Sequence, residues 1–371
     1  MKLRVERDVL ADAVAWAART LPSRPSMPVL AGLVLTAGDG AITLSSFDYE
    51  VSGKVTLAAD VAEPGTVLVS GRLLADIAKA LPAQPVTIEN EGTRVVITCG
   101  RSSFTLPTLP VEDYPQLPAM PESSGTITGQ AFAAAVSQVA VAAGRDDTLP
   151  TLTGIRMEFE GANITLAATD RYRLAVRELM WHPQSANISA QILVPARTLA
   201  DAAKSLADVD EVVIALSSGG QGEGLVGFEG AGRRTTTRLL DGEFPKYRSL
   251  LPSESNAIAN VETAALVDAV KRVALVAERN TPVKLAFESG ELTLRAGTGD
   301  DAQAREILEC SLEGDSIDIA FNPAYLLDGL AAVGSSSTQF SFTQANRPAV
   351  LSGDADSDDY SYLLMPVRLT G

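Results

Sequence analysis

The clearest pattern along the 371-residue chain is a helical spacing of apolar residues that returns three times. Apolar residues three, four and seven positions apart form one face of a helix, which is the face that packs on a core. The three segments carry Leu10, Ala13, Val14 and Ala17, then Phe132, Ala135, Val136 and Val139, then Leu266, Ala269, Val270 and Val273. One amphipathic helix is therefore predicted near the start of each third of the chain.

A second helix is predicted by another threefold repeat, which begins as a strand and continues as a helix. Its copies are Leu68–Asp76, Leu193–Asp201 and Ala320–Asp328, at offsets of 125 and then 127 residues. Each copy has an apolar face at positions i, i+4 and i+7. The residues of this face are Leu74, Ala78 and Leu81, then Leu199, Ala203 and Leu206, then Leu326, Leu330 and Val333. The same pair of helices is thus predicted three times, in the same order.

Between and after the helices apolar and polar residues alternate, which is typical of half-buried strands. Such segments are Ala41–Leu44, Val95–Thr98, Asn163–Leu166, Glu211–Ile214 and Glu291–Leu294. Glycine-containing turns at Gly38–Gly40 and Ser289–Gly290 fit hairpins between antiparallel strands. Each repeat is therefore predicted to be an α+β domain with two helices and many antiparallel strands.

The ends of the first two repeats share a proline-containing segment. Leu106–Pro115 resembles Leu239–Tyr247, and each leads into a stretch rich in proline and serine. We place boundaries in these stretches, which gives domains at residues 1–122, 123–253 and 254–371. Three similar domains in a row are compatible with an arc, and an arc with complementary ends closes through a head-to-tail contact.

Composition narrows the class of protein. With 46% hydrophobic residues the chain can bury real cores, and it contains no apolar run long enough to cross a membrane. The start of the chain, Met1–Arg7, does not resemble a secretion signal, and Cys99 and Cys310 are too far apart to suggest a disulfide framework or a zinc site. We therefore expect a cytoplasmic protein. The net charge of −16 is unusual for a protein that binds nucleic acid.

Catalytic and cofactor motifs are weak. The single histidine, His182, precedes a proline in a polar loop, so no Ser-His-Asp or Cys-His arrangement can be built without it. Gly222–Gly227 matches a dinucleotide motif by letters, but a strand follows it where a helix is required, which favours a hairpin loop. Asp354–Asp359 begins like a calcium loop but has Met365 at the twelfth position instead of glutamate. We predict no catalytic residue, no cofactor and no metal.

Basic residues nevertheless recur on the predicted helices at equivalent positions. Arg72 and Lys79 are seven residues apart and lie on one helix face, and Arg197 and Lys204 repeat this pair 125 residues later. The third repeat has Arg272 and Arg279 on its other helix, with Lys271 beside them. If helices lined a hole, these cations would attract the phosphates of a duplex without reading its sequence, while the acidic exterior would repel stray DNA.

Several segments resemble the bacterial DNA sliding clamps, the beta subunits of DNA polymerase III. The most specific are Thr169–Val176, Asp241–Tyr247 and Tyr362–Leu369, and Arg24–Leu30 is also similar. The resemblance extends over essentially the whole chain. It implies three tandem clamp domains in a head-to-tail homodimeric ring, with helices inside and sheets outside.

The resemblance also implies a function without catalysis. Such a ring is a processivity factor that encircles double-stranded DNA and holds the replicative polymerase catalytic subunit on it. A clamp loader opens the ring, and repair polymerases, ligase or mismatch-repair proteins bind it through short linear motifs. The expected location is the nucleoid, and no membrane is involved.

The family's sites can be carried over residue by residue. The resemblance places a partner-peptide groove at Leu152, Thr169, Arg171, Tyr172, Arg173, Leu174, Pro245, Leu250, Asn322, Tyr325, Leu363, Met365, Pro366 and Arg368. It places the dimer interface at Phe104, Leu106, Leu275 and Val276, and a DNA contact at Arg24. The sequence departs from the family at Ser249, where a basic residue is usual, and at Pro348, where a small polar residue is usual.

Two alternatives remain open. A scaffold built from repeats could bind proteins without a role on DNA, since a fold does not determine a function. A hydrolase based on two carboxylates is the other alternative, although nothing in the spacing of the 46 acidic residues singles out a pair.

Overall fold

The computed structural model describes residues 1–217, 224–277, 281–297, 302–353 and 359–368. The chain forms two compact units. The first unit comprises residues 1–130 and 201–239, and the second comprises residues 131–200 and 240–371. The predicted hairpin loop at Gly222–Gly227 and the acidic loop at Asp354–Asp359 lie partly outside the described residues.

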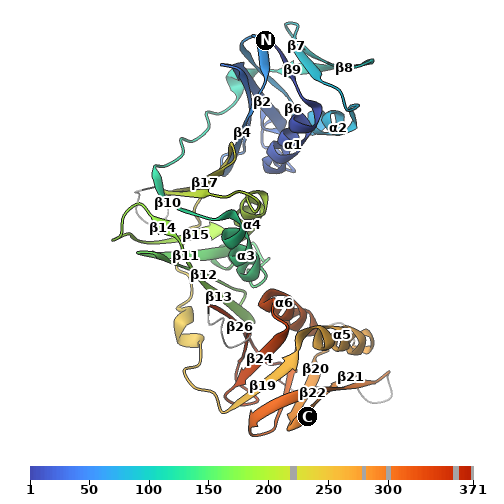
Figure 1. Cartoon of the computed structure of the whole chain (residues 1–371), viewed down its shortest axis with the longest axis vertical. Coiled ribbons are helices and arrows are strands. Elements are labelled where there is room, and N and C mark those ends of the chain that lie inside the picture. Colours follow the sequence, from blue (N-terminus) through green and yellow to red (C-terminus); the bar gives the residue numbers. More distant parts are fainter. Residues whose placement is uncertain (218–223, 278–280, 298–301, 354–358, 369–371) are drawn as a thin grey trace. The chain divides into compact units, whose positions relative to one another are not determined.

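The predicted helix pair is confirmed in all three repeats. The first helices are α1 (Arg7–Ala17), α3 (Gly129–Ala140) and α5 (Thr263–Val273), and the second helices are α2 (Gly71–Ala80), α4 (Ala196–Ser205) and α6 (Pro323–Val333). Every residue of the two predicted apolar faces is buried. In the first and third repeats the two helices pack on each other and on one face of the adjoining strands (Figure 1).

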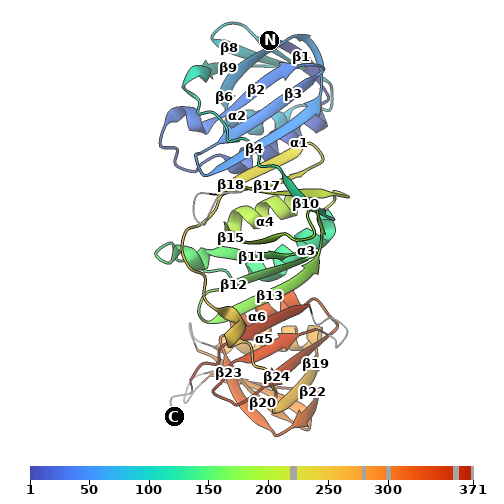
Figure 2. The same ribbon diagram turned by 90° about the vertical axis from the view of Figure 1, so that its left-hand side faces the viewer.

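The strands of the first unit form one continuous antiparallel arrangement (Figure 2). The spatial order is β10 (Ser123–Ile127), β16 (Val212–Leu216), β17 (Leu225–Gly230), β18 (Arg233–Arg238), β4 (Val51–Ala58), β3 (Ala41–Phe47), β2 (Gly32–Gly38), β6 (Gly65–Ser70), β9 (Ser102–Leu109), β8 (Arg94–Cys99), β7 (Val86–Asn90), β1 (Lys2–Val5) and β5 (Asp60–Glu63). The pairing of β18 with β4 joins strands of the central and first repeats.

The strands of the second unit form another antiparallel sheet. Its order is β15 (Ser189–Pro195), β11 (Gly154–Glu160), β12 (Asn163–Thr169), β13 (Arg173–Met180), β26 (Tyr360–Leu364), β25 (Ala349–Ser352), β24 (Ser337–Phe342), β19 (Ala257–Glu262), β22 (Ala304–Gly314), β21 (Gly290–Ala296), β20 (Val283–Glu288) and β23 (Ile317–Phe321). The pairing of β13 with β26 joins strands of the central and third repeats. The short strand β14 (His182–Pro183) carries the single histidine, which is exposed, where the sequence predicts a polar loop.

Turn chemistry fixes the register of the hairpins. Asp39 and Gly40 both have positive φ, at 49° and 72°, and they join Gly38 to Ala41 as a two-residue loop. Such a loop matches the twist of the strands that flank it. All five predicted strand segments coincide with observed strands, except that Glu211 lies one residue before β16, and the α+β architecture of each repeat is confirmed.

Candidate functional site

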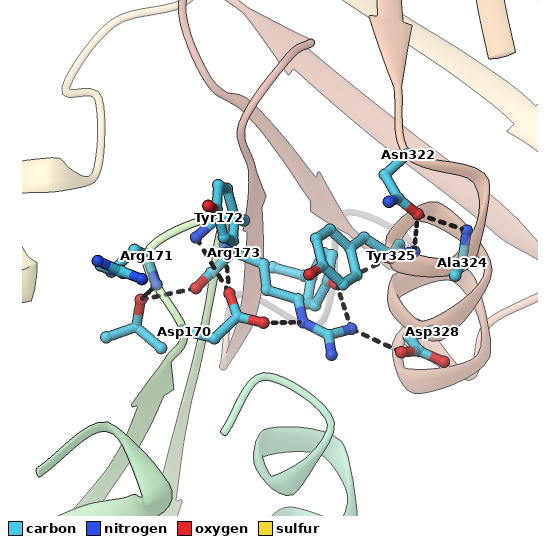
Figure 3. Close-up of polar contacts among 10 residues, drawn as sticks. Asp170, Arg171, Tyr172, Arg173, Asn322, Ala324, Tyr325 and Asp328 are labelled. Atoms are coloured by element: carbon cyan, nitrogen blue, oxygen red, sulfur yellow. Dashed lines mark hydrogen bonds and ion pairs between the residues drawn. The ribbon is translucent and has the colours of Figure 1, made fainter. Parts of the chain in front are cut away.

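The most elaborate polar site of the second unit is built on the turn between β12 and β13. Oδ1 of Asp170 accepts hydrogen bonds from the backbone N–H groups of Tyr172 (3.0 Å) and Arg173 (3.1 Å). The hydroxyl of Thr169 donates to the carbonyl of Arg173 at 2.7 Å. Arg171 has a φ of 80°, which this double bracing by Asp170 and Thr169 holds in place. The turn therefore presents Arg171 and Tyr172 outward while Arg173 points back into the protein (Figure 3).

Arg173 is the centre of this site. Its side chain is only 5% exposed, and its guanidinium bonds to Asp170 at 3.0 Å and to Asp328 of α6 at 2.6 Å. The guanidinium also lies 4.3 Å from the ring centre of Tyr325, a cation–π distance. Arg173 thus ties the β12–β13 turn to α6 (Figure 3). Most of its donors therefore face residues of this chain.

The ionisation of this cluster follows from its burial. Burial lowers the pKa of Arg173, but the hydrogen bonds and charges of Asp328, Tyr362 and Asp170 outweigh that effect and raise it. Burial raises the pKa of Tyr362, so its hydroxyl stays protonated and donates to the carbonyl of Tyr325 at 2.8 Å. The cluster is therefore a fixed ion pair rather than a group poised to exchange protons.

The first turn of α6 completes the site. Oδ1 of Asn322 accepts from the N–H groups of Ala324 (2.9 Å) and Tyr325 (3.3 Å), which caps the helix (Figure 3). This cap positions the Tyr325 ring, which stacks on Tyr172 with ring centres 6.1 Å apart. A depression of about 540 Å³ lies beside these rings, and Leu152 and Arg171 also line it.

An apolar floor continues from this depression. Leu174 and Leu363 are buried in one cluster with Phe244 and Tyr247. These two aromatic residues belong to the segment that links the central and third repeats, and that segment ends in a short helical turn, Tyr247–Leu250. The cluster therefore fastens the linker to the sheet formed by β13 and β26.

A buried carboxylate holds the same linker from the other side. Glu158 is buried, and it accepts hydrogen bonds from the Tyr247 hydroxyl (3.1 Å) and from Arg156 (2.7 Å). Arg248 bonds at 2.6 Å to Oε2 of Glu158, the same oxygen that accepts from Tyr247. Burial and the neighbouring charge of Glu158 raise the pKa of Tyr247. Ser249, the residue that departs from the family, donates to the carbonyl of Lys246 and is exposed.

The predicted groove residues are brought together in part. Leu152, Arg171, Tyr172, Arg173 and Tyr325 line the depression. Met365 adjoins them, because its N–H donates to the carbonyl of Tyr172 at 2.9 Å. Asn322 caps α6 beside the site. The remaining predicted residues are buried beneath the site, belong to the linker, or lie along the C-terminal segment: Thr169, Leu174, Leu363, Pro245, Leu250, Pro366 and Arg368.

Sequence reasoning missed the partners that hold the site together. Asp170, Asp328, Tyr362 and Glu158 were not predicted as site residues. Asp328 had a signal, since it is the third member of the repeated aspartates, but its two counterparts, Asp76 and Asp201, are exposed. Only the fold reveals that Asp328 faces a buried arginine.

The predicted cations of α2 and α4 are exposed. Arg72 and Lys79 lie on α2, and Arg197 and Lys204 lie on α4. Arg24 is exposed in the loop before Pro28. The predicted cations also omitted Arg7 of α1 and Arg19 of the helical turn that follows it (Ala18–Thr20). Both share with Lys79 a shallow depression of about 510 Å³. Arg279 lies outside the described residues, and Arg272 is bound to Glu306 at 2.6 Å.

One predicted interface residue requires correction. Leu106 is only 1% exposed and belongs to the core of the first repeat, so its side chain is not available to another subunit. Phe104, two residues earlier on the same face of β9, is exposed. Leu275 is 84% exposed and Val276 is half-buried, in the short helical turn that follows α5.

Two kinds of feature are absent from the described residues. No group of three or more histidine, cysteine, aspartate or glutamate side chains in the described part of the chain could hold a metal ion. Among the helices in the described ranges, none has the length and hydropathy to cross a bilayer.

Comparison with known proteins gives matches along the whole chain. Models of the N-terminal, central and C-terminal domains of the DNA polymerase III beta subunit match residues 1–118, 126–246 and 248–368. The chain is 63% identical to the beta sliding clamp of Streptomyces coelicolor, with 100% of both chains covered.

Solved structures agree with these matches. A sliding clamp of Pseudomonas aeruginosa bound to griselimycin superposes with a TM-score of 0.93 at 29% identity, over 100% of both chains. The sliding clamp of Bacillus subtilis superposes with a TM-score of 0.92 at 26% identity, over 100% of this chain and 99% of that one.

Proposed function

The chain belongs to the DNA polymerase III beta subunits, the bacterial beta sliding clamps, and on that premise we propose which of its residues carry each part of the function. It is a processivity factor and not an enzyme: a dimeric ring around DNA that keeps a polymerase in place. Retention on DNA then depends on closure of the ring and not on tight binding, which is compatible with a net charge of −16.

The groove around Arg173 is the proposed docking site for polymerase and other partners. The main support is the cluster in which Arg173 forms ion pairs with Asp170 and Asp328. This cluster fixes the wall of a depression that lies beside exposed Tyr172 and above buried apolar residues. A preformed apolar trough with a few fixed polar groups suits a short peptide with apolar residues and a glutamine. Met365 adds a flexible, adaptable side chain at its edge. The clamp loader, repair polymerases, ligase and mismatch-repair proteins are proposed to use the same groove.

The cations of α2 and α4 are proposed to face the duplex. Arg72, Lys79, Arg197 and Lys204 are exposed, and contacts from such residues to phosphates are independent of sequence. Arg24 is proposed as a further DNA contact. Weak, sequence-independent contacts suit a ring that slides, and such a role would place the protein at the nucleoid.

Ring closure is proposed to reproduce the two strand pairings already present within the chain. The first and central repeats join through β4 and β18, and the central and third repeats join through β13 and β26. The fourth strand of each repeat is β4, β13 and β22 in turn. The last strand of each repeat is β9, β18 and β26 in turn. Ser102–Pro107 of β9 pairs with β8 alone among the described strands, which leaves one edge open. We propose that this edge pairs with β22 of a second copy.

The internal pairings also give a register for closure. Gly53 lies opposite Thr235 in the first unit, and Ala175 lies opposite Tyr362 in the second. The equivalent positions place Ala304 opposite Phe104, on the face where Phe104 and Leu275 are exposed. Arg305 then lies opposite Ser103 on the other face. Val276 is proposed to join Leu275 in covering Phe104.

A disulfide trap tests this register. In Ser103→Cys/Arg305→Cys, oxidation should link two subunits at both contacts, because directly opposite residues have Cβ atoms about 4.5–5.5 Å apart. In the control Ser103→Cys/Ala304→Cys, the second cysteine points to the opposite face of the sheet, and no link should form. Equal cross-linking of the two variants would reject the register.

Charge reversal tests the DNA face. Changing Arg72, Lys79, Arg197 and Lys204 to glutamate should reduce the time that the clamp remains on circular DNA, while peptide binding at the groove stays unchanged. A control that reverses Lys54, Arg94, Arg4 and Lys246, all exposed outside these helices, should leave retention intact. Loss of retention in both would indicate a general charge effect, and loss in neither would favour a scaffold that binds only proteins.

A further inference from the structure

The outer face of the third repeat carries a row of cations that no described residue neutralises. Lys284 of β20 lies directly opposite Arg295 of β21, and Arg295 lies directly opposite Arg305 of β22. All three are exposed, and within the described ranges none forms an ion pair. Like charges directly opposite each other on a sheet are destabilising, and a bound anion would relieve this repulsion.

The strands place this row opposite the helices. Val283 and Leu285, which flank Lys284, are buried, whereas Lys284 itself is exposed. Because side chains alternate along a strand, the cations project from the face that does not pack on α5. The family resemblance implies that helices line the ring and sheets form its outside, so this face is expected on the outside. DNA held inside the ring is therefore not the anion that this row fits.

The C-terminal segment connects the row to the groove. Met365 bonds to the carbonyl of Tyr172 at the groove, and two residues later the N–H of Val367 donates to the carbonyl of Ala320 at 2.8 Å. Ala320 is the residue of β23 that lies directly opposite Lys284. Two extended residues span about 7 Å, so the row begins within one short step of the groove.

A depression lies along this path. It has a volume of about 740 Å³, and Val367 and Arg368 line it together with Lys284, Arg295 and Arg305. Four cations therefore face one concave surface, although the chain as a whole carries a net charge of −16. Further along the same strands the charge reverses, because Glu288 and Glu291 are opposite each other four residues from the cations. The basic end is the end next to the groove.

We propose that this surface, defined as Lys284, Arg295, Arg305 and Arg368, is a second docking site that binds acidic residues flanking the groove-binding motif of a partner. The proposal rests on the proposed function of the groove. Its ligand is an extended peptide segment with two or three carboxylates next to the apolar motif. Exposed ion pairs of this kind add modest affinity, but they discriminate between partners that share the same motif.

The test uses two synthetic peptides with one glutamine-containing apolar motif, flanked at both ends either by three aspartates or by three asparagines. Binding to the full chain is measured by fluorescence anisotropy at low salt. The acidic peptide should bind about fivefold more tightly, as expected for a few exposed ion pairs, and half-molar salt should remove the difference. The variant Lys284→Gln/Arg295→Gln should also remove it and leave the affinity for the neutral peptide unchanged.

The controls separate the possible failures. The matched variant Arg4→Gln/Arg94→Gln removes two exposed strand cations of the first unit and should keep the preference for the acidic peptide. Equal affinity for both peptides, or a preference that survives Lys284→Gln/Arg295→Gln, would overturn the second site and leave the groove intact. If neither peptide binds, the groove itself is wrong. If the variant instead loses affinity for a single-stranded oligonucleotide and not for the acidic peptide, the row is a nucleic-acid contact, and the proposal is overturned.

Discussion

The two internal junctions share one backbone arrangement but differ in their side chains, and the depression beside Tyr172 and Tyr325 lies at the second of them. The turns Asp48–Val51 and Asp170–Arg173 are equivalent in the repeat. In each, the aspartate accepts hydrogen bonds from the N–H groups two and three residues later, at 2.8–3.1 Å. The residue after each aspartate has a positive φ, of 77° and 80°. In each, the strand of the following repeat continues the sheet beside the turn.

The side chains make the difference. Where the second unit has Arg173, the first has Val51, which pairs with Thr237 of β18. Where β26 has Tyr362 and Leu363, β18 has Thr235 and Thr236, and the Thr236 hydroxyl bonds to Ser52. The first junction is thus closed by small polar residues. The comparison teaches that the repeat supplies the framework, and that a few large or charged side chains distinguish the copy that carries the proposed binding site.

The largest effect is expected from removing the arginine that distinguishes the two junctions. Arg173→Ala leaves Asp170 and Asp328 without their partner and should lower the free energy of unfolding of the second unit by about 2–3 kcal/mol. The loss stays below the 3–5 kcal/mol of a fully buried pair because the Asp328 side chain is 44% exposed. Val51→Ala at the equivalent position should cost about 1 kcal/mol. Urea unfolding followed by the fluorescence of Trp181, with Trp16 replaced by Phe, reports on the second unit.

The same change should weaken binding of a groove peptide more than tenfold, since the turn and α6 lose their common anchor. Val51→Ala should leave peptide binding unchanged. If Arg173→Ala costs no more stability than Val51→Ala, and peptide binding survives, the distinction between the junctions does not lie in this ion pair.

A smaller effect is expected from a glycine that makes room for the groove. Gly329 of α6 stands where the other repeats have Ile77 and Ala202, and a Cβ there would overlap the Tyr362 ring. Gly329→Ala should therefore destabilise the second unit by about 1–2 kcal/mol, even though alanine favours helices by about 1 kcal/mol.

A double-mutant cycle isolates that overlap. Gly329→Ala should become neutral or stabilising in a Tyr362→Thr background, which restores the residue type found in β18, and the coupling should be about 1–2 kcal/mol. Ala202→Gly in the central repeat should simply cost about 1 kcal/mol. Additivity of the two changes would show that Tyr362 does not require the glycine.

The smallest effect is expected at Tyr114, the tyrosine of the first of the two repeated linker segments. Burial, with a smaller contribution from Asp48, raises the pKa of Tyr114 to about 12, although its hydrogen bond with Phe47 lowers it. Because the pKa of Tyr114 is raised in the folded state, its protonated hydroxyl contributes its full stabilisation of the fold below the unfolded pKa, near 10. That contribution to the free energy of unfolding is lost as the pH rises toward 12. Tyr114→Phe should cost about 1 kcal/mol at pH 8, through loss of the hydrogen bond to the Phe47 amide.

The difference in the free energy of unfolding between Tyr114→Phe and the unmodified chain should shrink by about 1 kcal/mol between pH 10 and 11. Urea midpoints of the first unit, followed by Trp16 alone, provide the measurement. A difference that is constant across this range would mean that Tyr114 titrates as it does in an unfolded chain.

The repeat made the fold predictable from sequence, and the site only in part. The spacing of apolar residues predicts the six helices and the five named strands, because each of these elements buries one face. The groove followed from resemblance, since Leu363 and Tyr325 look like ordinary core and helix residues. The ion pair of Arg173 with Asp328 joins residues 155 positions apart, and nothing local signals it. Leu106 was misassigned because alternation along β9 does not reveal where the core ends.

Topological retention tests the central claim most directly. The clamp, loaded with clamp loader and ATP onto a nicked circular plasmid, should remain with the DNA through gel filtration at a salt concentration that removes ordinary phosphate contacts. Cutting the plasmid once should release it, and blocking the cut ends with bound protein should prevent that release. Clamp that stays on the linear, unblocked DNA, or that leaves the intact circle at the same salt, would contradict the claim that a closed ring and not affinity holds this protein on DNA.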